Sequence, residues 1–516
     1  MWSLCLLSLL SLFPPMTLAL ACTNLTSLTG TADVDTWAKT SSQTSFLNNI
    51  TYCNISGTIS SRIRVWLKLP TAQSWNGRYV QIGCGGACGN NPFSNTYFDI
   101  NGTLSSGYAL ATTDMGVPSS GDNFGPMHDD LQMRIDWGYL ATHLTSVMGK
   151  QVVEAVYGRE AAYAYHLGSS TGGRQSLVEA QRYPEDFNGV FAIAPAYNET
   201  GVTTFSIAWT ARAMLEDEID FTPAVTGAEA DLIHARVLEE CDRLDGLVDG
   251  IVSLPRLCHP DLESLVCGSP SNRTINGTCI SAKAFEAVKK VYSGSVSLTG
   301  QKQVPEGLLP GSEASRKGTY IPSTTGQPSA WYTFAKSFLS YYAFWPDPVV
   351  PVTPFSVNLT DPELIRQTSK TESLEYGGVA DMEKFHLLGG KVIMTQGLQD
   401  VAVAPGFAKD LWERVGVAMG SERENFFRYF EMPGVNHVSG GPGADQYDAF
   451  GVLVDWVENG IAPEVIVASH LGDDGNAEFT RPLYQYPMIA VYDGKGDASS
   501  WESFGPVSDS VEFWNL

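Results

Sequence analysis

Basic residues are scarce in this sequence and form no cluster. Only 32 of its 516 residues are Lys or Arg, against 56 that are Asp or Glu, and the formal net charge is -24. Nucleic-acid backbones and anionic lipids attract cationic surfaces, so this composition argues against either as a partner. After residue 21, charges or glycines interrupt every apolar run within a few residues, and we expect no later membrane span.

The first 21 residues also lack Lys and Arg, yet they otherwise have the features of a secretory signal peptide. This apolar segment ends in Ala-Leu-Ala, a small-x-small pattern that a signal peptidase accepts. A membrane anchor is the alternative, but the run is shorter than the ~20 apolar residues of a spanning helix and contains two consecutive prolines. We therefore predict a secreted, extracellular protein whose mature chain, without residues 1–21, begins at Cys22.

Cysteine is infrequent, but the predicted mature chain keeps an even number. These eight residues are enough for four disulfides in an oxidising compartment: Cys22, Cys53, Cys84, Cys88, Cys241, Cys258, Cys267 and Cys279. Eight N-x-[ST] sequons agree with passage through a secretory pathway and are candidate glycosylation sites: Asn24, Asn49, Asn54, Asn101, Asn198, Asn272, Asn276 and Asn358.

Apolar runs that resemble strands alternate with helical patterns. Expected strands lie at 62–70, 78–83, 161–168, 189–195, 391–397 and 426–434, and a helical pattern covers 136–158. A strand, a helix and a further strand form a parallel crossover, so the fold class is α/β with a mostly parallel sheet. We expect a catalytic domain at 22–199 and 386–516, interrupted by a lid domain at 200–385 that is rich in Pro, Gly and Ser linkers.

The stretch "GSSTG" at 168–172 fits the nucleophile-elbow pattern G-x-S-x-G between an expected strand and an expected helix. Flanking glycines permit the strained turn that lifts the central serine, Ser170, above the sheet. A phosphate-binding loop is the alternative, but the lysine of such a loop is missing. Ser170 is therefore the predicted nucleophile, rather than its neighbour Ser169.

A nucleophilic serine needs a histidine base that is oriented by a carboxylate. Of the five histidines after Ser170, His437 follows an expected core strand within a glycine-rich loop. Asp400 lies just past the strand before it, and Asp410 on the following helix is the alternative acid. The oxyanion donors are expected to be the backbone N–H groups of Thr171 and of Gly86, with Gly85 as a second possibility.

At this point the sequence resembles the tannase and feruloyl esterase family of α/β-hydrolases. The resemblance extends over most of the mature chain and includes "WNGRYVQIGCGGACG", "AYAYHLGSSTGGRQSLVEAQRYPEDFNGVFAIAP", "GLQDVAVAP" and "MPGVNHVSGGPGADQYDAFGVLVDWVENGIAPE". It implies that Ser170, Asp400 and His437 form the catalytic triad, and that the lid covers a pocket for the aromatic acyl part of an ester. It also suggests that Cys22 pairs with Cys53.

The family ordinarily has cysteines before the nucleophile and after the catalytic histidine, joined as a disulfide. Ser169 and Val438 occupy those positions here, so we expect a chain that lacks this disulfide. Tyr484 similarly stands at a usual cysteine position. Cys84 and Cys88, by contrast, are not expected from the family, and the sequence leaves their partners open.

A cluster of aspartates within the expected lid has oxygen donors that suit Ca²⁺. Read alone, such residues are more often merely solvated, but the family resemblance implies a structural calcium ion. Its implied ligands are the carboxylates of Asp242, Asp245 and Asp249 and the carbonyls of Leu247 and Ile251, bracketed by Cys241 and Cys258.

The leading hypothesis is a secreted serine esterase that acts on small or polysaccharide-linked esters of hydroxycinnamic or gallic-type acids. The alternatives are an esterase or lactonase of a secondary-metabolite pathway, a catalytically silent relative that binds phenolic ligands, and a peptidase. The sequence does not indicate the natural ester or the oligomeric state.

Overall fold

The computed structural model describes residues 22, 28–47, 50–91, 93, 97–118, 121–270, 275, 277–324 and 326–508. The predicted signal peptide lies outside these residues, as do four of the eight sequons, at Asn24, Asn49, Asn272 and Asn276. No helix among the described residues is long and apolar enough to cross a membrane.

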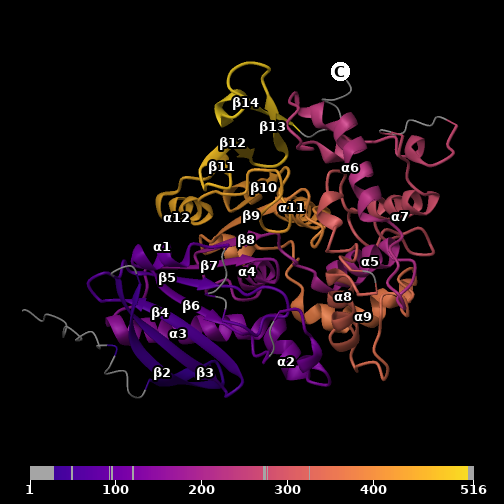
Figure 1. The fold of residues 1–516 in the computed structure, drawn as a ribbon. Coiled ribbons are helices and arrows are strands. Elements are labelled where there is room, and N and C mark those ends of the chain that lie inside the picture. The colour runs from indigo at the N-terminus through magenta and orange to yellow at the C-terminus, as the bar shows by residue number, and fades with distance from the viewer. Residues whose placement is uncertain are drawn as a thin grey trace, which may run out of the picture.

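A ten-stranded sheet forms the centre of the molecule (Figure 1). Its order is β1-β2-β3-β4-β6-β5-β7-β8-β9-β10. The strands are β1 (Thr29–Ala32), β2 (Asp35–Leu47), β3 (Ile50–Ile59), β4 (Ile63–Pro70), β5 (Arg78–Ile82), β6 (Ala109–Thr113), β7 (Tyr163–Ser169), β8 (Gly189–Ile193), β9 (Lys391–Gly397) and β10 (Phe427–Met432). The first part of the order, through β4 to β6, is antiparallel, and the pairs from β6 to β10 are parallel. The predicted α/β-hydrolase core with a mostly parallel sheet is confirmed.

Side chains from the central strands enter two separate cores because they alternate between the two faces of the sheet. Val190 and Ala192 of β8 lie in the larger core, whereas Phe191 and Ile193 lie in the smaller one. Helices α3 (Ala141–Tyr157), α4 (Thr171–Arg182) and α11 (Gly406–Met419) contribute to the larger core, and α1 (Ile100–Ser105) and α12 (Ala449–Asn459) contribute to the smaller one. The sheet is therefore covered by helices on both faces.

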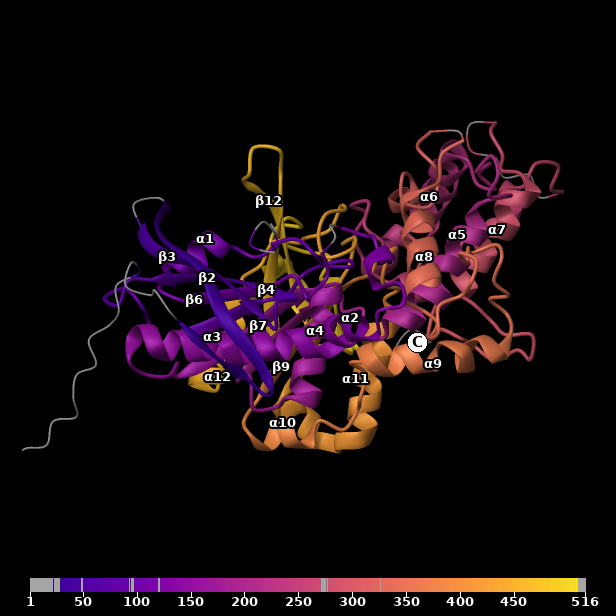
Figure 2. The same ribbon diagram turned by 90° about the horizontal axis from the view of Figure 1, so that it is seen from below.

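The chain between β8 and β9 adds no described strand to the main sheet, and most of it lies to one side of the sheet in both views (Figures 1 and 2). We refer to residues 194–390 as the insertion. Its α-helices are α5 (Ala208–Met214), α6 (Gly227–Cys241), α7 (Ala282–Ser293), α8 (Ala330–Tyr341), α9 (Pro362–Glu375) and α10 (Glu383–Leu387). Its sequence position agrees with the expected lid, but the domain boundaries at 200 and 385 stay a prediction.

Two small antiparallel sheets follow the last core helix. They are formed by β11 (Val465–Leu471) with β12 (Ala477–Tyr484) and by β13 (Met488–Tyr492) with β14 (Phe504–Ser508). His470, one of the histidines that follow Ser170, lies in β11. Tyr484, at a position where the resemblance has a cysteine, donates its hydroxyl hydrogen to the carbonyl of Phe504 at 3.0 Å. This hydrogen bond joins the two small sheets.

Candidate active site

Ser170 lies in the sharp turn between β7 and α4. Its backbone has φ 57° and ψ -121°, a conformation that non-glycine residues rarely adopt and that raises the side chain above the sheet. The turn is tight because the helix starts immediately: a Cβ added to Gly168 would lie 2.1 Å from the carbonyl oxygen of Gly172. Glycine is thus required there, as the G-x-S-x-G pattern predicts.

His437 links Ser170 to Asp400. Its Nε2 lies 2.9 Å from Oγ of Ser170, and its Nδ1 lies 2.8 Å from Oδ2 of Asp400. The three residues come from the carboxyl ends of three parallel strands, because Asp400 follows β9 and His437 follows β10. The structure therefore brings together all three residues of the predicted triad, in hydrogen-bonding geometry.

The carboxylate of Asp400 is fully buried and has defined partners on both oxygens. Oδ1 accepts hydrogen bonds from the backbone N–H groups of Ala402 and Val403, and Oδ2 accepts one from Nε2 of Gln396 as well as contacting His437. Asp410, the alternative acid, instead accepts hydrogen bonds from Tyr197 and Arg414. Asp400 is the acid that the geometry favours.

Two further carboxylates influence the base. Burial lowers the pKa of His437, but the negative charges of Asp400, Glu199 and Asp122 outweigh this effect, so the pKa lies above its ordinary value. A histidine that accepts a proton and then holds it next to a carboxylate is the arrangement required of a general base.

Gly86 and Thr171 lie against each other beside the nucleophile. The hydroxyl of Thr171 donates to the carbonyl oxygen of Gly86 at 2.9 Å. Gly86 has φ 57°, which a glycine adopts without strain. This contact fixes the glycine loop against the start of α4, where both predicted oxyanion donors line the same cavity as Ser170.

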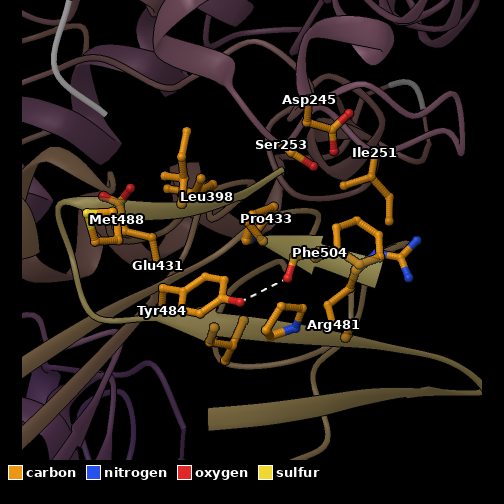
Figure 3. A pocket seen from close by; sticks show the side chains of 15 residues that line it. Asp245, Ile251, Ser253, Leu398, Glu431, Pro433, Arg481, Tyr484, Met488 and Phe504 are labelled. Carbon is orange, nitrogen blue, oxygen red and sulfur yellow. Dashed lines mark hydrogen bonds between the residues drawn. The ribbon is translucent and has the colours of Figure 1, made fainter. Parts of the chain in front are cut away.

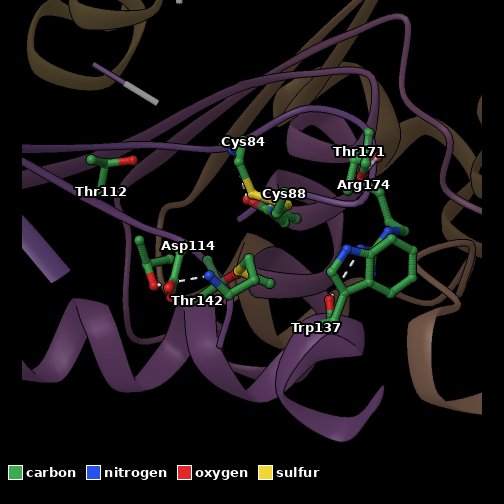
Figure 4. Close-up of a disulfide and its surroundings, with 12 residues drawn as sticks. Cys84, Cys88, Thr112, Asp114, Trp137, Thr142, Thr171 and Arg174 are labelled. Atoms are coloured by element: carbon green, nitrogen blue, oxygen red, sulfur yellow. Dashed lines mark hydrogen bonds between the residues drawn. A yellow bond between two sulfur atoms is a disulfide. The ribbon is translucent and has the colours of Figure 1, made fainter. Parts of the chain in front are cut away.

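A disulfide also belongs to this region, and it corrects the expectation that the chain lacks one beside its catalytic residues. Cys84 is bonded to Cys88 within the loop that carries Gly86 (Figure 4). The side-chain amide of Gln175 on α4 lies 3.1 Å from Sγ of Cys84. The loop is therefore tied both to itself and to the helix of the nucleophile.

The expectation was wrong because it considered only the positions that flank the nucleophile and the histidine. Those positions hold Ser169 and Val438, whereas the disulfide forms within the neighbouring glycine loop. All eight cysteines of the predicted mature chain are paired: Cys22–Cys53, as the resemblance implied, Cys84–Cys88, Cys241–Cys258 and Cys267–Cys279. Four disulfides indicate formation in an oxidising compartment.

A cavity of about 180 Å³ opens at Ser170. Much of its apolar wall comes from the insertion, in which Trp331 and Phe334 belong to α8 and Val202 and Ile207 belong to the π-helical turn η5 (Gly201–Ile207). The indole of Trp331 stands edge-on to the imidazole of His437, with ring centroids 6.4 Å apart.

The residues of this cavity that sequence reasoning missed include Trp331, Phe334, Glu199 and Asp122. For Glu199 a signal existed, because it follows β8 by six residues and β8 is the neighbour of the nucleophile's strand. Trp331 and Phe334 are more than 150 residues beyond Ser170 in the sequence, and no local pattern marks them.

The aspartates predicted to bind calcium lie at η6 (Asp242–Asp245) and in the loop that follows. Asp242 accepts hydrogen bonds from the N–H groups of Asp249 and Gly250, and Asp249 forms an ion pair of 2.6 Å with Arg481. Burial raises the pKa of Asp245 to about 6, and the charges of Asp249 and Asp242 add to this shift.

The surroundings of these aspartates join the insertion to the small C-terminal sheets. Asp245 and Ile251 line one side of a cavity of about 30 Å³, and Arg481, Tyr484 and Phe504 line the other (Figure 3). Within the described residues, the three carboxylates do not gather within 4.8 Å of one another. A cation held by all three would require these carboxylates to move closer together.

A family model described as "Tannase and feruloyl esterase" matches residues 48–507, which is most of the chain. The chain belongs to this family. Mono(2-hydroxyethyl) terephthalate hydrolase from Piscinibacter sakaiensis is 31% identical over 518 residues, covering 88% of this chain and 84% of that protein. Probable feruloyl esterase B-1 from Aspergillus flavus is 29% identical over 467 residues, with 86% and 84% covered.

The fold of a solved relative agrees with this membership. The crystal structure of feruloyl esterase B from Aspergillus oryzae is 25% identical and has a TM-score of 0.77, with 90% of this chain and 92% of that chain covered. This member of the tannase and feruloyl esterase family is a carboxylic ester hydrolase. The predicted family, fold class and enzyme class are thereby confirmed, apart from the disulfide corrected above.

Proposed function

We propose that this protein is a secreted serine esterase that cleaves esters of aromatic acids through an acyl-enzyme intermediate. The observation that carries the proposal is the hydrogen-bonded series Ser170–His437–Asp400 at the base of a cavity walled by Trp331 and Phe334. Two aromatic rings beside a nucleophile suit a planar acyl group, because aromatic rings attract one another in stacked and edge-on arrangements.

In the proposed reaction, Oγ of Ser170 attacks the ester carbonyl while Nε2 of His437 takes up the hydroxyl proton. The backbone N–H groups of Thr171 and Gly86 donate to the oxyanion, and Asp400 orients the imidazole and stabilises its protonated form. His437 then returns the proton to the departing alcohol. A water molecule, deprotonated by the same histidine, hydrolyses the acyl-enzyme and regenerates Ser170.

The size of the cavity supports an aromatic acyl group. A dry protein cavity of ~150 Å³ accepts benzene, and the cavity at Ser170 measures about 180 Å³. One substituted ring fits this volume. The names of the relatives point the same way, since they include feruloyl esterases and a hydrolase of a terephthalate ester.

Secretion is supported by the four disulfides and by the predicted signal peptide at 1–21. Two of the predicted glycosylation sites, Asn101 and Asn358, are exposed. The side-chain oxygen of Asn198 accepts a hydrogen bond from the N–H of Gly201, which makes Asn198 a poorer acceptor for a glycan.

We also propose that Asp242, Asp245 and Asp249, with the carbonyls of Leu247 and Ile251, hold a structural Ca²⁺. The support is chemical: the donors are oxygens, two of the carboxylates are buried, and repulsion from Asp249 and Asp242 adds to the rise in the pKa of Asp245 that burial causes. A bound ion would neutralise this repulsion. It would also strengthen the contact between the insertion and the C-terminal sheets.

The proposal is tested by assaying the purified protein on methyl ferulate, methyl gallate, chlorogenate and p-nitrophenyl acetate. We expect the aromatic-acid esters to be cleaved with the higher kcat/KM. Ser170→Ala is expected to be inactive, and Ser169→Ala, which changes the neighbouring buried hydroxyl, should retain most activity. Cleavage of the acetate alone would overturn the aromatic substrate class, and full activity of Ser170→Ala would overturn the mechanism.

A further inference from the structure

Glu199 is a buried acidic residue in the active-site cavity that the proposed reaction does not use. Its side chain is 3% exposed and lines the same cavity as Ser170 and His437. It follows β8 and directly precedes the π-helical turn that supplies part of the apolar wall. A buried carboxyl group is costly unless it has hydrogen-bond partners, so its contacts indicate what it could bind.

One carboxylate oxygen of Glu199 is occupied and the other is not. Oε1 accepts a hydrogen bond of 2.8 Å from the hydroxyl of Thr203. Glu375 at the end of α9 holds the backbone of Glu199 and Thr200. Its two carboxylate oxygens accept hydrogen bonds from the N–H groups of these residues, at 3.0 and 2.8 Å. No described residue donates a hydrogen bond to Oε2. Glu199 is thus held in place with one acceptor oxygen available to a ligand.

Apart from the catalytic histidine, the ionisable groups with a charge that line the cavity are acidic. Among the described residues that line it, Glu199 and Asp122 are acidic and no Lys or Arg is present. Arg174 is the cation that acts on Glu199, but it is fully buried, donates to the carbonyls of Trp137 and Gly138, and does not line the cavity. An anionic acyl group would therefore meet carboxyl groups without a compensating cation.

We propose that Glu199 selects the acyl group, by accepting a hydrogen bond from a hydroxyl on its ring and by excluding acyl groups that carry a carboxylate. This inference rests on the proposed esterase function and specifies its substrate class as uncharged hydroxyaryl esters. A site that hydrogen-bonds a substrate hydroxyl discriminates strongly against an analogue that lacks it, because the buried acceptor is then left unpaired.

Three methyl esters separate the two parts of this proposal: p-coumarate, cinnamate and the monoanionic monomethyl terephthalate. Because burial raises the pKa of Glu199 above its ordinary value, the wild-type protein, Glu199→Gln and Glu199→Leu are compared by kcat/KM at an alkaline pH of about 8. Glu413→Gln, on the exposed face of α11 and paired with Lys409, is the matched control for the loss of one carboxylate.

The expected changes are in ratios of kcat/KM, which cancel a general loss of activity. Glu199→Gln should raise the kcat/KM for the terephthalate ester relative to that for methyl cinnamate by about tenfold, since it removes the repelling charge at constant size. Glu199→Leu should lower the kcat/KM for methyl p-coumarate relative to that for methyl cinnamate by about tenfold, since it removes the hydrogen-bond acceptor. Glu413→Gln should leave both ratios unchanged.

Unchanged ratios in Glu199→Gln and Glu199→Leu, with normal melting temperatures and normal turnover of p-nitrophenyl acetate, would overturn the inference while the esterase function stands. If Glu199→Leu does not fold, Glu199→Gln and Thr203→Val still test the inference. Thr203→Val removes the hydrogen bond that holds the carboxylate of Glu199 in place but keeps its charge, so it should weaken only the preference for a ring hydroxyl. A wild-type protein that cleaves none of the esters would overturn the proposed function instead.

Discussion

The two walls of the active-site cavity are held in different ways. On the sheet side, Ser170, His437 and Asp400 lie at the ends of parallel strands and are fixed by backbone hydrogen bonds and by one another. On the insertion side, Trp331 and Phe334 project from one helix and are held by apolar packing. The difference separates reaction chemistry, which demands fixed geometry, from apolar contact with the acyl ring, which an adaptable surface can provide.

Asp400→Asn should cause the largest loss on the sheet side. An amide that donates to Nδ1 would favour the wrong tautomer of His437, and kcat should fall by about 10⁴-fold. Asp410→Asn, on the neighbouring helix, is the control and should keep nearly normal kcat although it weakens the contact with Arg414. A loss of less than about hundredfold for Asp400→Asn would show that another group orients the histidine.

Removing the disulfide of the glycine loop should reduce turnover as well as stability. Cys84→Ser with Cys88→Ser should reduce kcat about 10- to 100-fold, because the loop that carries Gly86 becomes less fixed. The bond closes a loop of only four residues, so the chain-entropy estimate of its contribution is about 2 kcal/mol.

The matched control lies in the insertion. Cys267→Ser with Cys279→Ser opens a loop of 12 residues and should cost about 3 kcal/mol of unfolding free energy while kcat stays normal. Thermal unfolding and steady-state kinetics on both double variants check this pair of predictions. Equal effects of the two pairs on kcat would contradict a role of Cys84–Cys88 in positioning the loop.

Phe334→Ala should weaken binding of aromatic esters without disabling the reaction. The loss of apolar contact predicts an increase in KM of about tenfold for methyl ferulate, with kcat changed little. Tyr332→Phe, on the same helix but bonded to Glu218 outside the cavity, should change neither constant. A large fall in kcat for p-nitrophenyl acetate would place Phe334 in the reaction chemistry instead.

Glu199→Gln should extend activity to lower pH. His437 must be neutral to accept the serine proton, and its pKa lies above the ordinary value partly because of the charge of Glu199. Without that charge the pKa falls, so the acidic limb of the kcat/KM profile should move to lower pH. A limb that stays in place or moves to higher pH in the pH–rate profile would contradict this coupling.

Chelation of divalent ions should have the smallest effect on turnover. The proposed calcium ligands lie in the insertion, so a chelator should lower the melting temperature by a few degrees through mass action and leave the kcat of the folded enzyme unchanged. Added Ca²⁺ should restore the melting temperature. An unchanged melting curve in the chelator, with no calcium in elemental analysis, would refute the proposed ion.

The catalytic side of the site could be predicted from sequence because local patterns determine it. G-x-S-x-G specifies the turn at Ser170, and Asp400 and His437 each follow an apolar strand whose end must lie at the same edge of the sheet. Strands such as β9 were recognised from continuous apolar residues, as expected for strands that are buried on both faces.

The remaining features depend on contacts that a single sequence does not encode locally. β2, "DTWAKTSSQTSFL", is rich in Ser and Thr and lacks clear apolar alternation, because it lies near the antiparallel edge of the sheet. Phe334 reaches the cavity because α8 of the insertion lies beside the carboxyl ends of the strands that carry Ser170 and His437. The Cys84–Cys88 bond was left open because eight cysteines permit many pairings at the level of sequence.

The disulfides also bear on how the chain assembles. They span 31, 4, 17 and 12 residues, so each closes a local loop, and the two that lie between β8 and β9, Cys241–Cys258 and Cys267–Cys279, shorten that path only slightly. Those strands pair in parallel although about 200 residues separate Gly189 from Lys391. The entropy of closing a long loop rises only slowly, by about 0.6 kcal/mol for each doubling of its length. Large changes in the length of the insertion would thus cost the sheet little stability. The insertion side of the cavity is therefore free to diverge in evolution while the strand ends that carry the triad stay the same.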